Sequence, residues 1–125
     1  MANAKRKPKE TAAPAVQRGS LVLLKKKLES GSNMVVIVSN DFQNEASDYL
    51  LAIPLERRAA RLKAPFSVDL GRADGMRDLH TARCDWVTRI KKNQIKNIER
   101  ASFSEAVLRR LEEGLKVALG FRELI

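Results

Sequence analysis

Hydrophobic residues in this chain fall into short runs separated by polar turns, a pattern typical of β-strands. The segments SLVLLKK, from Ser20, and NMVVIVS, from Asn33, are apolar stretches of strand length, and the second is rich in β-branched residues. The segment ESGS between them has turn composition, so the pattern predicts that the two strands pair as a hairpin. The polar stretch NDFQNEASD that follows contains helix-capping residues and predicts one or two helical turns.

The strand pattern continues through the middle of the chain. YLLAIPL predicts a short strand that ends near Pro54, because proline cannot donate a hydrogen bond to a ladder. In PFSVDL apolar and polar residues alternate, which is typical of a half-buried strand. GRADGM has turn composition, and DLHTARCDWV and NIERA predict two further strands.

A helix is predicted at the end of the chain. Ser102 and Glu105 match an S-x-x-E capping box, Gly120 is suited to the C-terminal end, and Gly114 inside the helix costs about 1 kcal/mol relative to alanine. One helical face would carry the apolar residues Phe103, Val107, Leu108, Leu111, Leu115, Ala118 and Leu119. The element order predicts an α+β, mainly β fold, a small SH3-like antiparallel barrel with a C-terminal helix.

Length and composition limit the organisation to one compact domain. The chain has 125 residues and is 44% hydrophobic, so it can form a single modest core. Residues 1–17 are rich in Ala, Pro and Lys without periodicity and predict a flexible basic arm, while residues 18–125 form the domain. The only cysteine, Cys84, excludes an internal disulfide and favours the cytoplasm. The longest apolar run, MVVIV, is far below the roughly 20 residues of a membrane span.

Positive charge points to an anionic partner. The net charge is +9 and the pI about 10.1, with the basic residues in an N-terminal tail and in two clusters, Glu56 to Lys63 and Arg89 to Arg100. A single cluster is typical of a solvated helix face. Three clusters in one small domain favour a phosphate-binding surface or an acidic protein partner.

Several ordered segments resemble the MazF/PemK family of toxin ribonucleases, from Arg18 to Phe121. RGSLV resembles the family's RGD-x-V, VVIVSN its VVVSN, AIPL its VVPL, PFSVDL its PF-x-V-x-L, and VALGF its LALGL. The resemblance implies the family's barrel with its terminal helix, which CcdB shares, and a homodimer. It also implies sequence-selective cleavage of single-stranded RNA without a cofactor, commonly restrained by an acidic antitoxin.

Within the segment TARCDWV, Arg83 and Asp85 match the R-C-D of the PemK and Kid branch, whose arginine and aspartate are assigned to catalysis. On a strand these two side chains would share one face, about 7 Å apart, with Cys84 on the other. Asp85 would serve as the base that deprotonates the RNA 2′-hydroxyl, and Arg83 as an electrostatic clamp on the phosphate. The alternative is an ordinary cross-strand ion pair.

Three positions depart from the family pattern. Asn33 and Met34 stand where most members have a functional arginine, Glu56 replaces an active-site threonine, and the first loop is shortened to KKKLESGS. Glu56 is interpreted as a substitute carboxylate, or as part of a solvated charged turn. The RNA-binding residues are predicted to be Asn33, Arg57, Arg58, Lys91 and Lys92. Arg57 or Arg58 would replace the lost cation, and both lysines are expected in the basic runs nearest the site.

Other reactive residues fit structural roles. His80 is the only histidine, so no multi-histidine metal site exists and no metal is predicted. Cys84 is predicted to be a buried small hydrophobe. Trp86 would pack in the core or at a dimer contact, and base stacking is its alternative.

A metal-independent endoribonuclease is therefore the leading hypothesis for function. The first alternative is a catalytically silent relative that binds nucleic acid, which the changed positions Asn33 and Glu56 favour. The second is an interaction toxin like CcdB, which acts on gyrase through its C-terminal helix. The chain ends in FRELI and lacks the Trp-Gly-Ile ending of that class.

Overall fold

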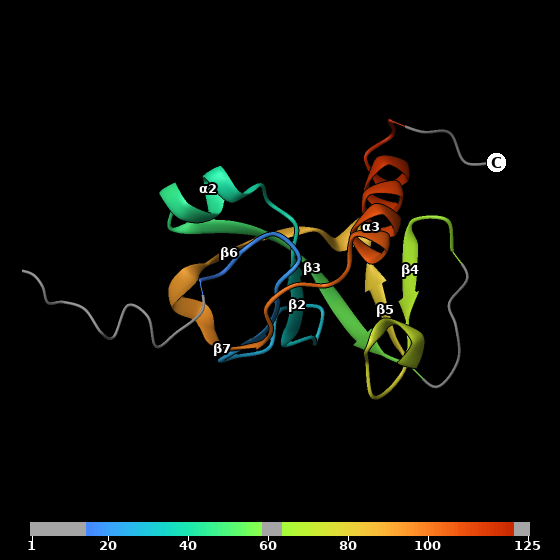
Figure 1. The fold of residues 1–125 in the computed structure, drawn as a ribbon, viewed down its shortest axis with the longest axis horizontal. Helices are drawn as coiled ribbons and strands as arrows, with labels where there is room; N and C mark the ends of the chain where they lie inside the picture. Colours follow the sequence, from blue (N-terminus) through green and yellow to red (C-terminus); the bar gives the residue numbers. More distant parts are fainter. Residues whose placement is uncertain (1–14, 59–63, 122–125) are drawn as a thin grey trace, which may run out of the picture.

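The elements of the fold follow the predicted order (Figure 1). A computed structural model describes residues 15–58 and 64–121. The strands are β1 (Leu21–Leu24), β2 (Met34–Ile37), β3 (Tyr49–Arg57), β4 (Ser67–Leu70), β5 (His80–Arg83), β6 (Thr88–Lys91) and β7 (Ile95–Arg100). The helices are α2 (Asp41–Ala46) and α3 (Glu105–Ala118), with short 3-10 turns η2 (Arg72–Asp74), η3 (Cys84–Trp86) and η4 (Lys92–Gln94).

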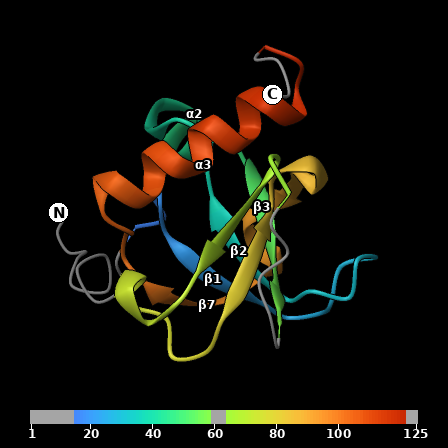
Figure 2. The ribbon, with the colours of Figure 1, turned by 90° about the vertical axis from the view of Figure 1, so that its right-hand side faces the viewer.

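All strands belong to one antiparallel sheet with α3 lying across it (Figure 2). The strand order is β4-β5-β3-β2-β1-β7, and β6 pairs with β3. The predicted hairpin of β1 and β2 is confirmed, with Val22 opposite Val35. The mainly β fold with a C-terminal helix is therefore confirmed. No helix in the described part of the chain is long and apolar enough to cross a membrane.

β3 corrects the prediction that a strand ends near Pro54, because it continues to Arg57. One edge of β3 pairs with β6 as far as Ala52 and with β5 only from Leu55 onward. The carbonyl oxygen of Leu51 accepts a hydrogen bond from the Val38 amide, on the β2 side of β3. Backbone polar groups of successive strand residues point to alternate edges, so those of Pro54 point to the opposite, interrupted edge. The proline thus lies where no ladder hydrogen bond is required of it.

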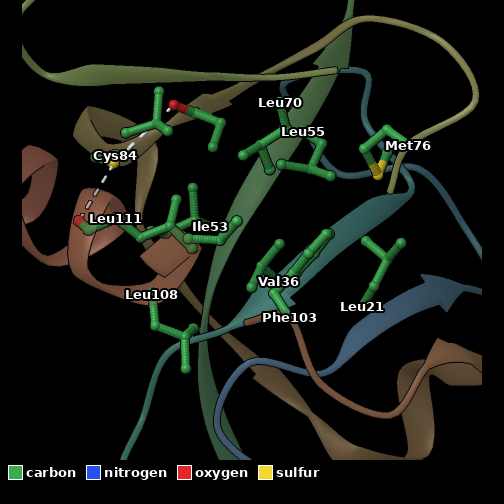
Figure 3. Packing of buried hydrophobic residues seen from close by; sticks show 13 residues of the cluster. Leu21, Val36, Ile53, Leu55, Leu70, Met76, Cys84, Phe103, Leu108 and Leu111 are labelled. Atoms are coloured by element: carbon green, nitrogen blue, oxygen red, sulfur yellow. Dashed lines mark hydrogen bonds between the residues drawn. The ribbon is translucent and has the colours of Figure 1, made fainter. Parts of the chain in front are cut away.

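The first strand pairs are buried on both faces of the sheet. On one face α3 packs Val107, Leu108 and Leu111 against Val36 and Ile53 (Figure 3). On the other face the sheet curves around a second cluster made of Val22, Leu24, Val35, Ile37, Leu50, Ala52 and Ile90. Two-sided burial explains why these strands read as continuous apolar runs rather than alternating ones.

The sequence did not predict β6. Its segment TRIK was read as part of a basic cluster, and only Ile90 in it is fully buried. A strand with one inward apolar residue and charged neighbours carries too little alternation to be distinguished from a loop. The predicted helical turn after β2 is α2, and the side chain of Asn40 caps it by accepting from the Gln43 amide.

The N-terminal cap of α3 also differs from the prediction. Ser104, rather than Ser102, accepts a hydrogen bond from the Val107 amide and caps the helix. Phe103, directly before the cap, is buried, and this anchor fixes where the chain enters the helix. Ser102 instead donates to the Arg18 carbonyl oxygen. Gly120 follows the C-cap Leu119 with a φ of 83°, in agreement with its predicted place.

Residues 1–14 of the predicted arm lie outside the described residues, so its flexibility stays a prediction. Val16 packs against the second core cluster, and the amide of Gln17 donates to the Ser20 hydroxyl. Val16 and Gln17 therefore contact the domain, although they precede its predicted start at Arg18.

Candidate active site

The segment around Cys84 leaves the strand earlier than the sequence predicts. β5 ends at Arg83, and Cys84 to Trp86 form the turn η3. The thiol of Cys84 points into the core, where its Sγ lies 3.8 Å from the Leu111 carbonyl oxygen (Figure 3). A Cβ at Gly114 of α3 would lie only 2.6 Å from this sulfur, so the close packing of helix and turn requires glycine there.

Arg83 and Asp85 are joined directly as a result of this turn. Arg83 Nε donates to Asp85 Oδ1 at 3.0 Å, and Arg83 Nη2 donates to Asp85 Oδ2 at 2.7 Å. The expected geometry of two strand residues about 7 Å apart on one face was wrong, because residue 85 is no longer on the strand. The two side chains form a bidentate ion pair, the arrangement with the best defined geometry for these groups.

Glu56 extends the ion pair into a cluster of four charges. Its Oε1 lies 3.5 Å from Arg83 Nη1 and 3.5 Å from Arg58 Nη1. The register of β3 and β5 explains this, since Glu56 stands opposite Thr81 and on the same strand face as Arg83. The formal charges of Arg58, Arg83, Glu56 and Asp85 cancel. Glu56 therefore lies beside Arg83, a position compatible with its interpretation as a substitute carboxylate.

Arg83 keeps its positive charge in this environment. Its pKa is raised, first by the hydrogen bonds to Asp85, against the lowering effect of burial, and further by the charges of Asp85 and Glu56. An arginine with a raised pKa does not release a proton near neutral pH. Its chemical capacity is to hold and stabilise negative charge.

Cys84 is chemically inert by the same kind of argument. Burial raises the pKa of its thiol to about 12, and the nearby charge of Asp85 acts in the same direction. The thiolate is the reactive form of cysteine, so a thiol held neutral is no nucleophile. The prediction of a buried small hydrophobe is confirmed.

Trp86 does not pack in the core, one of the two places predicted for it, and a dimer contact stays a prediction. The prediction assumed that Trp86 and Cys84 share one face of a strand, but the strand ends at Arg83. The turn η3 instead places the indole beside the charged cluster. The guanidinium carbon of Arg83 lies 3.7 Å from the centre of the indole ring. The centre of the Phe66 ring lies 5.8 Å from the same carbon. Arg83 is thus oriented by aromatic contacts as well as by Asp85.

A cavity of about 850 Å³ adjoins the cluster and brings several predicted residues together. Asn33, Glu56 and Arg57 all line it, together with His80. Sequence reasoning assigned His80 a structural or surface role, and its neighbourhood follows from the register that sets it opposite Arg57. His80 Nδ1 lies 2.9 Å from the Asp78 carbonyl oxygen. Arg57 Nη2 lies 3.3 Å from Asp78 Oδ2.

Lys91 and Lys92 lie at the opposite end of β3 from this cavity, not near it as expected. Lys91 stands opposite Tyr49, whereas His80 stands opposite Arg57. At about 3.3 Å per strand residue, the two ends are about 26 Å apart. Lys91 Nζ is 5.6 Å from the Tyr49 ring centre, and Lys92 Nζ donates to the Glu45 carbonyl oxygen.

Metal ligands do not gather in the described residues, where no group of three His, Cys, Asp or Glu side chains is placed to hold an ion. The end of FRELI, which the sequence used to separate this chain from CcdB, lies outside the described residues after Phe121.

The fold and a match between the sequence and a family model together define the class of protein. A curved antiparallel sheet with a C-terminal helix is the architecture, and residues 17–119 match the model of the family described as PemK-like, MazF-like toxin of type II toxin-antitoxin system. The chain belongs to this family. No curated protein sequence matches the chain significantly.

Similar solved structures agree with the fold. A mycobacterial endoribonuclease in complex with its cognate antitoxin is 21% identical, with 88% of this chain and 100% of that chain covered and a TM-score of 0.71. A second mycobacterial endoribonuclease has 19% identity, coverages of 86% and 94%, and a TM-score of 0.68. A MazE-MazF complex from Deinococcus radiodurans has 21% identity, coverages of 86% and 99%, and a TM-score of 0.65.

Proposed function

We propose that the protein is a toxin endoribonuclease that cleaves single-stranded RNA by attack of the RNA's own 2′-hydroxyl. Membership of the toxin family supports this, as do similar structures that are described as endoribonucleases. The observation that carries the proposal is the cluster of Arg83 with Asp85 and Glu56, a cation flanked by two carboxylates beside a large cavity. Such a cluster offers a charge stabiliser and a base side by side.

Arg83 is the charge stabiliser in this proposal. As the 2′-oxygen bonds to phosphorus and the bond to the 5′-oxygen breaks, negative charge grows on the non-bridging phosphate oxygens. A guanidinium that stays protonated stabilises that charge. Contacts with Asp85 and Trp86 fix its orientation before RNA binds, which reduces the reorganisation that the reaction requires.

The two carboxylates receive different roles. Both oxygens of Asp85 accept hydrogen bonds from Arg83, so we assign Asp85 to positioning the cation rather than to the base role that the sequence suggested. Glu56 approaches two guanidinium groups only at 3.5 Å and lines the cavity, which makes it the more available proton acceptor. Glu56 takes the 2′-hydroxyl proton, and the departing 5′-oxygen takes a proton from water.

RNA is proposed to run along the cavity and onto the basic surface. Asn33 and Arg57 line the same cavity as Glu56, and Arg58 contacts Glu56. Lys91 and Lys92 would contact only an RNA long enough to reach the far end of β3. The net charge of +9 supports strong, salt-dependent attraction of a polyanion.

The proposal includes an acidic antitoxin and a homodimer. Similar structures include complexes with an antitoxin, and the positive charge of this chain is complementary to an acidic partner. Leu119 and Phe121, just after α3, are 58% and 80% exposed. Exposed large apolar side chains are typical of surfaces that contact another protein. Light scattering at micromolar concentration tests the dimer, and a monomer alone would contradict it.

The cleavage proposal is tested by incubating the purified protein with a long single-stranded RNA in excess chelator. We expect cleavage and a 2′,3′-cyclic phosphate on the upstream fragment, because the nucleophile belongs to the RNA. Arg83→Ala should lower the rate by about a hundredfold, the usual effect of losing a charge stabiliser. Cleavage that needs added metal would contradict the proposed mechanism.

A catalytically silent nucleic-acid-binding protein is the second candidate. The observation that favours it is that Arg83 Nε, Nη1 and Nη2 all face carboxylate oxygens, which leaves fewer of its five N–H donors for a phosphate. If wild-type protein binds RNA tightly yet leaves it intact over hours, this candidate replaces the enzyme.

A further inference from the structure

A second cavity, of about 770 Å³, is lined mainly by arginine side chains. It lies where the end of β3 meets the connection between β4 and β5. Four arginines and one carboxylate line it, and these are Arg57, Arg58, Arg72, Arg77 and Asp78. Arg83, Glu56 and Asn33 do not line it. The cavity is therefore distinct from the cluster assigned to cleavage, although three of its residues also line the larger cavity.

The pairing of β3 with β5 brings these arginines together from two parts of the chain. Arg57, the last residue of β3, stands opposite His80, the first residue of β5. The amide of Arg58 donates to the Leu79 carbonyl oxygen at 3.0 Å. The segment that precedes β5 carries the other two arginines and begins with the turn η2. The register of the two strands thus places both pairs of arginines around one space.

The turn η2 is held in place by two further arginines, from α3 and β7. Arg110 of α3 donates to Asp74 Oδ1 at 2.8 Å. Arg100 of β7 donates to the Gly75 carbonyl oxygen at 3.1 Å, and a Cβ at Gly75 would collide with the Arg100 guanidinium. The backbone that carries two of the arginines of the cavity is therefore fixed before a ligand binds, which lowers the entropic cost of binding.

Positive charge in this cavity is only partly balanced. Arg57 Nη2 lies 3.3 Å from Asp78 Oδ2, and Arg58 Nη1 lies 3.5 Å from Glu56 Oε1. In the part of the chain that the structure describes, no carboxylate forms a salt bridge with either of the other two arginines. Four arginines against Asp78 and Glu56 leave a formal charge of +2. The cavity therefore suits an anion that carries more than one charge.

A group of linked phosphates matches this surplus of charge. A phosphodiester of a nucleic acid carries one negative charge, whereas a pyrophosphate group concentrates several within a few ångströms. Guanidinium groups stay protonated and bind phosphate oxygens bidentately. Among the described residues no aromatic side chain lines the cavity, so no ring there can stack on a base. Recognition in this cavity would depend on the phosphates.

We propose that this cavity is a binding site for linked phosphates of the pyrophosphate type, either as a free polyphosphate or as the 5′-triphosphate end of a nucleic acid. Arg72 and Arg77 supply donors that no carboxylate of the described chain occupies, and Arg57 and Arg58 complete the site. The inference goes beyond the proposed function, because it requires neither Arg83 nor a cleavage step.

Isothermal titration calorimetry with sodium pyrophosphate, in chelator and at constant ionic strength, tests this site. We expect pyrophosphate to bind at least about tenfold more tightly than orthophosphate, because it engages additional guanidinium groups. Arg72→Gln and Arg77→Gln should each weaken pyrophosphate binding about tenfold, the effect of losing a hydrogen bond between charged groups. Both side chains are exposed, so folding should be unaffected. Arg109→Gln, the same change at an exposed position of α3, is the control and should bind as the wild type does.

Deoxyoligonucleotides distinguish the two sources of the phosphates, since they lack the 2′-hydroxyl and stay intact under the proposed mechanism. A strand with a 5′-triphosphate that binds more tightly than pyrophosphate would assign the site to the end of a nucleic acid. A strand that binds no more tightly would assign it to a free polyphosphate.

Equal affinity for orthophosphate and pyrophosphate, or an equal loss of binding in Arg109→Gln, would overturn the site. Displacement of pyrophosphate by a 5′-hydroxyl strand as readily as by the 5′-triphosphate strand would show an ordinary phosphodiester surface instead. Equally ready displacement by a glutamate peptide of the same charge would show a surface that recognises charge alone. None of these measurements involves RNA cleavage, so such a failure leaves the cleavage proposal standing.

Discussion

Both carboxylate oxygens of Asp85 are held by Arg83, two residues earlier, through a bidentate ion pair. The pair spans the end of a strand, because β5 ends at Arg83 and Asp85 lies in the turn η3. The arginine of the predicted catalytic pair is therefore fixed in place by its own neighbour in the sequence.

Asp85→Asn and Glu56→Gln should both lower RNA cleavage by about a hundredfold, but for different reasons. Glu56→Gln removes the proposed base, whereas Asp85→Asn only loosens Arg83. RNA binding should survive Asp85→Asn or become tighter, since a negative charge leaves the phosphate site. A cleavage assay and a binding titration measure both effects. Cleavage that is lost in Asp85→Asn but unchanged in Glu56→Gln would exchange the two assignments.

Gly114→Ala should lower the free energy of unfolding by about 1–2 kcal/mol, although alanine is the better helix former. The new Cβ would lie 2.6 Å from Cys84 Sγ, so α3 or η3 must shift. Urea denaturation of the variant measures this. In a Cys84→Ala background the sulfur is absent, and the same substitution should become neutral or stabilising. A cost that is unchanged by Cys84→Ala would place the clash elsewhere.

The thiol of Cys84 predicts a loss of stability in alkaline solution. Its pKa is raised to about 12 in the folded protein, whereas an unfolded chain has the lower, ordinary cysteine value. The unfolded state therefore loses its proton first, and the contribution to stability, complete below the ordinary value, declines as the pH rises toward 12. Denaturant midpoints of wild type and Cys84→Ala measured across this range should converge. An alkylating reagent at pH 8 should label Cys84 only after unfolding.

The two ends of β3 should contribute differently to RNA binding. Arg57→Glu should weaken the binding of short and long RNA alike, because this end adjoins the cavity. Lys91→Glu should weaken only long RNA, since about 26 Å of strand separates it from Arg57. Binding titrations at several salt concentrations test this, and each substitution should also reduce the salt dependence for the RNAs it affects. Equal weakening of a three-nucleotide RNA by both would contradict the separation.

The sequence predicted the elements whose burial is simple and missed those set by local geometry. The hairpin of β1 and β2 and the helix α3 have long apolar patterns, which identify them without tertiary information. The place of Trp86 could not be predicted, because nothing in CDW indicates that the strand stops at Arg83. Its cause is tertiary: Cys84 fills the space that Gly114 leaves on α3, thirty residues later in the chain.

The candidate site followed the same division. Glu56 was interpreted as a substitute carboxylate or as part of a solvated charged turn, and the register of β3 and β5 places it beside Arg83. The distance of Lys91 from the cavity was missed, because a cluster of basic residues in sequence does not indicate which end of a long strand it will reach.

Pro54 has a consequence for how reliably the charged cluster assembles. Because its nitrogen carries no hydrogen, neither β5 nor β6 can slide along β3 by a residue pair without leaving a carbonyl oxygen unpaired opposite it. Glu56 lies two positions beyond Pro54, so the register that this proline favours is also the one that brings Glu56 beside Arg83.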